Sequence, residues 1–343
     1  MKVIAIVDER KTRVFEIDKP VPGRGEVLVR IKGCALCTFE QRVFTGAVKF
    51  PLPWVGGHEI AGVIEELGEG VDPAVYKAGT KIAPRTLNAC RTCYYCRHGM
   101  ENMCVNAYRS AAMAGKITPG GLGEYITMDI ENVYLLEDKL SFEEAVFAEP
   151  LGCVMNSIMQ GKIEVGDDVA VIGGGVMGML HILCSKLSGA RVILSEPDEK
   201  RAEFARKMGA DFVINPNAQD PVQAIKDLSG GRGAEVVFNT TPVSALAEQG
   251  IRMTAPAGRF VQYSSMHPDT PISLSPNWLH NSQAVLTGTK SPGIRAFNNS
   301  VNLLNKGLIN VKPLMSEVYD ITEADKAFER ALSAETFRVM IRL

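Results

Sequence analysis

The chain has 343 residues, of which 46% are hydrophobic and 22% charged, and its formal net charge at pH 7 is −2. This composition is ordinary for a globular protein, and the length favours two domains over a single core. The near-neutral charge gives no reason to expect nucleic acid or an anionic membrane as a partner, and no apolar run reaches the roughly 18 residues of a membrane span.

The first 150 residues carry short strand patterns that are separated by glycine and proline. Residues 1–7 hold one cation and an apolar run that is too short for the core of a signal peptide, so they predict a first strand. Residues 27–31 and 60–64 continue the series, which is typical of a β-barrel-like domain. Without a secretion signal we expect a reducing compartment, the cytoplasm, where clustered cysteines bind metal rather than form disulfides.

Four cysteines follow one another closely, at Cys90, Cys93, Cys96 and Cys104. The spacing C-x2-C-x2-C-x7-C lets four thiolates surround one zinc ion, with no position left for a substrate. The segment of about 88–106 is polar and short, so we expect a lobe whose fold depends on a structural zinc. The alternative is a set of four unrelated reduced thiols.

From about residue 165, strand patterns alternate with helix-length segments. The expected strands are residues 169–172, 192–194, 212–214, 236–239, 259–263 and 285–287. Two of the helix patterns between them cover residues 199–208 and 218–228. This alternation is typical of a doubly wound parallel sheet, here with six strands. The last 50 or so residues hold helix patterns at 295–306 and 323–332 and a strand pattern at 338–343, which the sequence alone could place in either domain.

The segment Gly173-Gly174-Gly175-Val176-Met177-Gly178 fits G-x-G-x-x-G directly after the first of these strands. In that context Gly173 permits a tight turn, Gly175 lets the backbone approach a pyrophosphate, and Gly178 packs the helix on the strand. The phosphates would meet the N–H groups at the helix N-terminus, so Val176 and Met177 also belong to the predicted cofactor site. A plain glycine turn is the alternative.

Glu196 ends the second strand of this series, at the place where a carboxylate can bind both ribose hydroxyls of NAD. The same carboxylate would repel the 2′-phosphate of NADP. Arg201 lies five residues further on and could accept that phosphate, although a solvated helix residue is the alternative. The sequence therefore predicts NAD as the cofactor.

Three further segments carry ligand-type residues: Cys34 and Cys37, His58 and Glu59, and Glu149-Pro150. These segments, together with the four cysteines and the glycine turn, resemble the zinc-dependent medium-chain dehydrogenase/reductase family. The resemblance includes the segment Gly120-Gly121-Leu122-Gly123-Glu124-Tyr125, and the motifs follow one another in the family's order over nearly the whole chain. The run Ala148-Glu149-Pro150-Leu151 resembles its polyol (sorbitol-type) and threonine dehydrogenase branch. In that branch an acid stands where classical alcohol dehydrogenases carry a cysteine as the third ligand.

The resemblance implies an α/β protein with a GroES-like β-barrel catalytic domain and a Rossmann domain. We expect the catalytic domain at about 1–151 and 290–343, and the dinucleotide-binding domain at 152–289 between them. The cleft between the two domains would hold zinc on one wall and nicotinamide on the other. A homo-oligomer, dimer or tetramer, is also expected.

The resemblance makes Cys37 and His58 ligands of a catalytic zinc, so that the implied cofactors are two zinc ions per chain and NAD. Glu149 would bind this zinc directly or through water, and Glu59 is a second carboxylate that can enter or leave the coordination. The zinc would lower the pKa of a substrate hydroxyl, and the carbinol carbon would pass a hydride to the nicotinamide.

The other three cysteines, Cys34, Cys153 and Cys184, are expected to be buried core residues. Cys153 lies one helical turn after Glu149, and the less favoured alternative is that it serves as a further zinc ligand.

The run Cys37-Thr38-Phe39-Glu40-Gln41-Arg42 departs from the family pattern C-x-[ST]-D-x-x-H. Phe39 stands where the family has a hydroxyl that relays the alcohol proton, and Arg42 stands near the place of the histidine. Either Thr38 takes over the relay, or the proton leaves through Glu59 or water. Glu40 matches the acid of the pattern, and we expect a supporting role for it.

The branch implies a small hydroxylated substrate, such as a polyol, a sugar derivative or a hydroxy-amino acid. Phe39 would narrow the pocket beside the zinc, and Arg295 falls where polyol dehydrogenases carry a cleft arginine. The alternative for Arg295 is a solvated residue that opens a helix. A reductase of ketones or aldehydes, and a zinc- or dinucleotide-binding protein without catalysis, are the competing functions.

Overall fold

The computed structural model describes residues 1–107, 115–266 and 268–343. The chain divides into two compact units, Met1–Gly152 together with Gly293–Leu343, and Cys153–Pro292. Among the described residues, no helix combines the length and the apolar character that crossing a bilayer requires.

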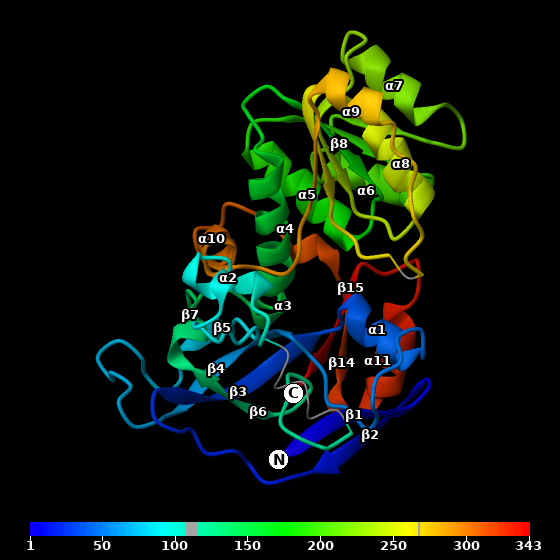
Figure 1. Cartoon of the computed structure of the whole chain (residues 1–343). Coiled ribbons are helices and arrows are strands. Elements are labelled where there is room, and N and C mark those ends of the chain that lie inside the picture. The colour runs from blue at the N-terminus through cyan, green and yellow to red at the C-terminus, as the bar shows by residue number, and fades with distance from the viewer. Residues whose placement is uncertain (108–114, 267) are drawn as a thin grey trace. The chain divides into compact units, whose positions relative to one another are not determined.

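The first unit contains a seven-stranded, mostly antiparallel sheet in the order β14-β15-β3-β4-β5-β7, with β6 paired to β3 (Figure 1). Its strands are β3 (Glu26–Ala35), β4 (Glu59–Leu67), β5 (Lys81–Pro84), β6 (Tyr125–Asp129), β7 (Val133–Leu135), β14 (Met315–Asp320) and β15 (Arg338–Arg342). A separate two-stranded sheet holds β1 (Lys2–Asp8) and β2 (Lys11–Glu16). Because β15 pairs with β3, residues from the two ends of the chain share one sheet.

Short helices complete this unit. They are α1 (Thr38–Phe44), α2 (Tyr94–Arg97), α3 (Phe142–Ala145), α10 (Ile294–Asn305) and α11 (Ala324–Ala331), with 3-10 turns η1 (Glu101–Met103), η3 (Ile130–Asn132), η4 (Lys312–Leu314) and η5 (Ile321–Glu323). The rings of Phe44 and Phe328 stack 4.6 Å apart and join α1 to α11 in the core. This contact fixes the helix that follows Cys37.

The second unit is a six-stranded parallel sheet in the order β10-β9-β8-β11-β12-β13. The strands are β8 (Asp168–Ile172), β9 (Arg191–Ser195), β10 (Phe212–Ile214), β11 (Ala234–Asn239), β12 (Thr254–Gln262) and β13 (Val285–Gly288). The order reverses at β8, as in a doubly wound sheet, which confirms the predicted six strands. Ligands of such sheets bind at the carboxyl ends of the strands, beside this reversal.

The helices of this unit are α5 (Val176–Leu187), α6 (Glu199–Lys207), α7 (Pro221–Leu228), α8 (Ser244–Met253) and α9 (Pro276–Ser282), and α4 (Ala148–Gly161) enters it from the first unit. The predicted start of α7 at residue 218 is wrong. The helix begins at Pro221 because Asp220 accepts a hydrogen bond from the N–H of Val222, and proline favours the first helical position.

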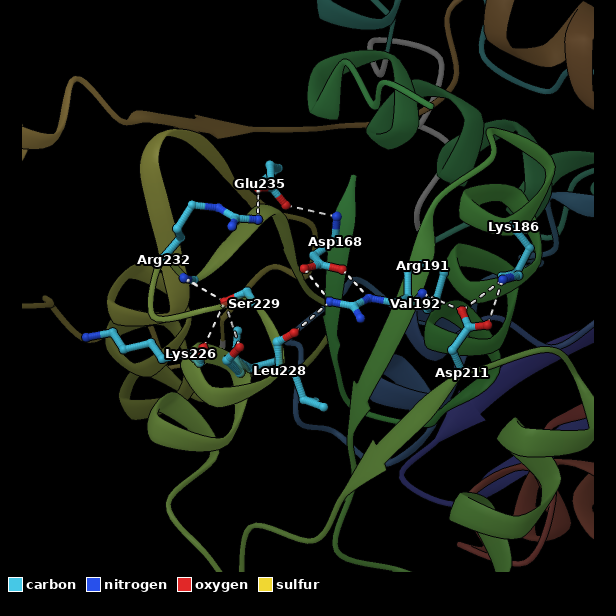
Figure 2. Close-up of polar contacts among 12 residues, drawn as sticks. Asp168, Lys186, Arg191, Val192, Asp211, Lys226, Leu228, Ser229, Arg232 and Glu235 are labelled. Carbon is cyan, nitrogen blue, oxygen red and sulfur yellow. Dashed lines mark hydrogen bonds and ion pairs between the residues drawn. The ribbon is translucent and has the colours of Figure 1, made fainter. Parts of the chain in front are cut away.

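A polar network ties together the amino ends of the parallel strands (Figure 2). Arg191, the first residue of β9, donates from Nε and Nη2 to the carboxylate of Asp168 in β8, at 2.5 and 2.7 Å. The same Nη2 donates to the carbonyl oxygen of Leu228 at 2.7 Å, and Glu235 of β11 accepts the N–H of Asp168. This edge of the sheet is closed by its own residues, which leaves the carboxyl edge for a ligand.

All eight cysteines are free thiols. Cys34 and Cys184 are buried, as predicted, but the prediction for Cys153 is wrong because its residue is only half-buried. The buried stripe of α4 runs through Leu151, Val154 and Ile158, and Cys153 lies beside it rather than on it.

Candidate functional sites

Cys37, His58 and Glu59 lie together in the first unit, with one ligand atom of each within 4.8 Å of the others. Cys37 occupies the N-cap position of α1 without a side-chain capping hydrogen bond, and Glu59 is the first residue of β4. Gly57, directly before His58, has φ +95°, and an added Cβ there would lie 2.7 Å from the Cys34 sulfur. The turn that presents His58 and Glu59 to Cys37 therefore needs glycine.

Glu40 holds the imidazole of His58. Its Oε1 lies 2.9 Å from Nδ1 of His58 and accepts the N–H of Gly57 at 3.0 Å. Burial raises the pKa of Glu40, but the charge of His58 and these hydrogen bonds outweigh it and hold the pKa below its ordinary value. Nδ1–H donates to the carboxylate, so Nε2 of His58 is the nitrogen available to a metal.

Arg338 compensates the charge of Glu59, and neither side chain is more than 3% exposed. Its Nη2 lies 3.0 Å from Oε1 of Glu59, and its Nη1 donates to the carbonyl oxygen of Leu36 at 3.1 Å. Burial raises the pKa of Glu59 to about 7, against the opposing charge of Arg338. The other oxygen, Oε2, is buried and has no hydrogen-bond partner among the described residues.

Glu149 lies outside the group of Cys37, His58 and Glu59. It is half-buried in the first turn of α4, near enough for its charge to raise the pKa of Glu59. Ser300 of α10 donates to the carbonyl oxygen of Ala148 at 2.7 Å and so anchors this end of α4. Zinc accepts a mixture of thiolate, imidazole and carboxylate ligands, which Cys37, His58 and Glu59 would supply. A bound cation would also give the buried Oε2 of Glu59 a partner.

The four cysteines of the lobe form a second group, with their sulfur atoms within 4.8 Å of one another. Backbone N–H groups point at the sulfurs: Cys90 donates to Cys104 at 3.3 Å and Cys93 donates to Cys90 at 3.4 Å. Hydrogen bonds, first that from the hydroxyl of Thr92, lower the pKa of Cys90 to about 5. A thiolate set of this kind is closed around one ion.

The glycine turn lies between β8 and α5. Gly173 has φ +95°, and an added Cβ on Gly178 would lie 1.9 Å from the Gly173 carbonyl oxygen, so the fold itself requires both glycines. An added Cβ on Gly175 would meet nothing within 4 Å. Gly175 is also the N-cap of α5 and supplies no side-chain cap. The space beside Gly175, next to the N–H groups of Val176 and Met177, therefore fits the phosphates of a dinucleotide.

Glu196 directly follows β9 and is 6% exposed. Its Oε2 accepts the N–H of Gly174 at 2.6 Å, and its Oε1 accepts the N–H of Asp198 at 2.9 Å. The structure therefore brings this carboxylate to the glycine turn. Arg201 lies in the first turn of α6, where its N–H is capped by Asp198 at 2.9 Å.

The two predicted substrate residues lie in different surroundings. Phe39, in the first turn of α1, packs its ring against Phe50 and Trp54 and is 40% exposed. Arg295 is an exposed residue in the first turn of α10. Neither belongs to the group of metal-ligand residues.

Sequence reasoning missed Arg338, Phe50 and Trp54. Arg338 comes 279 residues after Glu59 (338 − 59), and no local spacing connects the two. It reaches the site because β15 pairs with β3, and β3 also pairs with β4, which begins at Glu59.

Two family models match the chain: "Alcohol dehydrogenase GroES-like domain" over residues 23–138 and "Zinc-binding dehydrogenase" over 176–306. The L-threonine 3-dehydrogenase of Pyrococcus furiosus is 30% identical, over 100% of this chain and 99% of the relative. The sorbitol dehydrogenase of Halalkalibacterium halodurans is 28% identical, over 96% and 94%. A zinc-binding dehydrogenase from Sinorhizobium meliloti, solved with NADP, has a TM-score of 0.91 at 24% identity, over 100% of this chain and 99% of that one, and shares the fold.

Proposed function

The chain belongs to the zinc-dependent medium-chain dehydrogenase/reductase family, in its polyol and threonine dehydrogenase branch, and we propose that it transfers a hydride between NAD(H) and a secondary alcohol or its ketone. The group of Cys37, His58 and Glu59, with ligand atoms within 4.8 Å of one another, carries the proposal. The names of the relatives support a polyol, a sugar derivative or a hydroxy-amino acid as the substrate.

In this proposal Cys37 and His58 would be zinc ligands, Glu149 would bind the ion directly or through water, and Glu59 would be a second carboxylate able to enter or leave the coordination. Zinc supplies Lewis acidity there, which lowers the pKa of a substrate hydroxyl toward neutral. The chain orients the ligands: Glu40 accepts the Nδ1 proton of His58 and so turns Nε2 to the metal. The lobe of about 88–106 holds the second zinc through Cys90, Cys93, Cys96 and Cys104 and takes no part in the chemistry.

We assign the catalytic domain to residues of about 1–151 and 290–343, and NAD binding to 152–289. The N–H groups of Val176 and Met177 would meet the pyrophosphate in the space that Gly175 leaves beside the helix. Glu196, held by two backbone N–H groups, would accept hydrogen bonds from the ribose hydroxyls.

Glu196 supports NAD over NADP. Two like unit charges in contact at an effective dielectric constant near 20 repel by about 4 kcal/mol, enough for a large preference. Arg201, in the next helix, is the residue that could offset this repulsion. Kinetics of the Glu196→Ala variant with both cofactors would test the assignment, and an unchanged preference would refute it.

The proton of the alcohol needs a route other than that of the family, because Phe39 replaces the relay hydroxyl. Either Thr38, one residue earlier, would accept it, or the proton would leave through Glu59 or water. Thr38→Val and Glu59→Gln variants distinguish the routes by the pH profile of kcat.

We further propose that the substrate is a small hydroxylated compound and that Arg295 forms a hydrogen bond with it. The protein is proposed to be a homo-oligomer, dimer or tetramer, in the cytoplasm. The eight free thiols support a reducing compartment. A vicinal diol or sugar-derived alcohol should be a better substrate than ethanol.

The test is metal analysis of the purified chain together with cofactor reduction by a panel of polyols, polyol phosphates, threonine and ethanol. We expect about two zinc ions per chain and NAD reduction that is faster with a hydroxylated compound than with ethanol. One zinc per chain, or no hydride transfer with any alcohol, would contradict the proposal.

A further inference from the structure

Three aromatic rings of the first unit form one cluster, which we call the aromatic triad: Phe39, Phe50 and Trp54. The ring centroid of Phe39 lies 6.0 Å from that of Phe50 and 5.8 Å from that of Trp54, and its plane is at 90° and 85° to theirs. Phe50 and Trp54 are 4.8 Å apart. Two edge-type contacts therefore fix the orientation of the Phe39 ring, because a rotated ring would lose both.

The same two segments carry the triad and the candidate metal ligands. Phe39 stands in α1 between Cys37, the N-cap, and Glu40, which holds His58. An added Cβ on Gly56 would lie 2.6 Å from the ring of Trp54, so this indole covers the backbone two residues before His58. The three rings thus lie in the chain between Cys37 and His58, with a candidate metal ligand close in sequence at each end.

Phe39 remains 40% exposed although its two partner rings are half-buried. A single exposed phenylalanine needs no explanation by itself. This one is held in place by two other rings, and it stands where the family has a small hydroxyl side chain. It offers a substrate an apolar wall that cannot accept or donate a conventional hydrogen bond.

We propose that the aromatic triad selects a cyclic polyol, a ring-form sugar or cyclitol, whose C–H face packs on Phe39 while its hydroxyls point away from the ring. This inference rests on the proposed function and names the substrate class of the same site. A ring with equatorial hydroxyls has two faces of axial C–H groups, so it presents apolar and polar surface in separate directions.

The other substrate shapes fit the triad less well. An open-chain polyol carries hydroxyls on every side, and each hydroxyl that is buried against the triad without a partner weakens binding. A small alkanol buries too little apolar area to gain from the wall. The apolar wall therefore discriminates by the arrangement of hydroxyls rather than by their number.

A matched pair of probes tests this: myo-inositol and sorbitol have the same number of carbons and hydroxyls, and only the first is a ring. The chain has two tryptophans, so a Trp278→Phe background leaves Trp54 of the triad as the only indole reporter. In the zinc-loaded chain we expect saturable changes of Trp54 fluorescence with both compounds, and a Kd for myo-inositol at least tenfold lower. The kcat/KM values with NAD should show the same order.

Phe39→Ser restores the hydroxyl typical of the family, and Phe39→Leu keeps an apolar side chain without a ring. Phe39→Ser should lower the preference for myo-inositol about tenfold, with zinc content and NAD affinity unchanged, and Phe39→Leu should lower it less. Equal affinities in the parent chain, a preference for sorbitol, or an unchanged ratio in Phe39→Ser would overturn the inference.

The two proposals fail separately. If no alcohol reduces NAD but myo-inositol changes Trp54 fluorescence and Phe39→Ser abolishes the change, the triad binds cyclic polyols and the proposed dehydrogenation is wrong. If NAD is reduced and the two probes are used equally well, the dehydrogenase stands and the role of the triad is wrong.

Discussion

The candidate sites of the two units present different chemical groups to a charged ligand, paired side chains in the first unit and backbone N–H groups in the second. The first unit pairs each buried carboxylate with a side chain from another segment, Glu40 with the half-buried His58 and Glu59 with the buried Arg338. At its glycine turn the second unit offers mainly backbone, namely the turn itself and a helix N-terminus. The carboxylate at this turn, Glu196, accepts hydrogen bonds from backbone N–H groups. A buried charge is tolerated only when it is paired, whereas N–H groups at a helix end suit an anion without any side-chain charge.

This difference explains why the two sites differ in how far they spread along the chain. Soft and anionic ligands for a cation have to come from side chains, and each buried side-chain charge demands a partner from another element. Phosphate binding needs only one turn and the start of one helix. The first site therefore draws its charged residues from α1, β4 and β15, whereas the phosphate site of the second unit needs only a few consecutive residues.

The largest expected effect is that of His58→Ala. It should lower turnover about a thousandfold and remove one of two zinc ions, because His58 is a zinc ligand in the proposed site. The fold should remain, with a lower thermal stability, because the buried Glu40 carboxylate loses its partner. Cys93→Ser is the matched variant at the other metal group and should remove the other zinc and destabilise the lobe. Metal analysis, calorimetry and kinetics check both. Two variants with the same metal content and activity would remove the distinction between the groups.

Arg338→Met should lower the free energy of unfolding by about 3–5 kcal/mol, because it leaves the Glu59 carboxylate buried without its compensating charge. Urea denaturation of the zinc-loaded chain measures it. Adding Glu59→Gln to Arg338→Met should restore part of the loss, since the uncompensated charge is then gone. If the double variant is as unstable as the sum of the single ones, the pair is not coupled.

Two glycine substitutions separate fold from ligand in the second unit. Gly178→Ala should lower the melting temperature, since its Cβ would lie 1.9 Å from a backbone oxygen. Gly175→Ala should keep the melting temperature, because nothing lies within 4 Å of its Cβ, and should weaken NAD binding about 10- to 100-fold, or about 1.4–3 kcal/mol. Titration calorimetry measures the affinity. An unchanged affinity in Gly175→Ala would mean that the pyrophosphate does not lie there.

The smallest effect concerns His181, the buried imidazole of α5. Its Nδ1 donates to the carbonyl oxygen of Met177 at 2.8 Å, and its Nε2 lies 2.9 Å from the hydroxyl of Ser157. Burial lowers the pKa of His181 from 6.5 to about 4. Between these values the unfolded chain binds a proton that the folded chain does not, so stability is full above pH 6.5 and falls as the pH drops toward 4.

From pH 7 to pH 5 this one group should lower the free energy of unfolding by about 2 kcal/mol. Denaturation of the parent chain and of His181→Gln at both pH values measures it. The variant should be less stable at pH 7 and lose less on acidification. A loss on acidification as large as that of the parent would assign the acid sensitivity to other groups.

Local patterns were predictable and distant partners were not. The cysteine spacing and the glycine turn each lie within one short segment, and the structure brings each set together as the spacing indicates. A supporting role for Glu40 was expected from its place in the family pattern, and the structure shows its contact with His58 at 2.9 Å.

Arg338 could not be predicted, because its pairing with Glu59 depends on which strands become neighbours and not on any motif. The contacts of Phe39 with Phe50 and Trp54 could not be predicted for a similar reason. In the sequence Phe50 and Trp54 resemble ordinary core residues. Their contacts with Phe39 of α1 depend on the course of the chain before His58.

The discontinuous first unit sets an order of events during synthesis. Residues 153–292 are complete before Gly293–Leu343 emerge, so the parallel sheet can form while the first unit still lacks β14 and β15. At 5–20 residues per second, Glu59 precedes Arg338 by roughly 14 to 56 seconds. During that time the nascent carboxylate has no guanidinium to pair with. We expect the half-built sheet to leave Glu59 in water until the last strand arrives, so that the buried pair of Glu59 and Arg338 is completed only after translation of this strand.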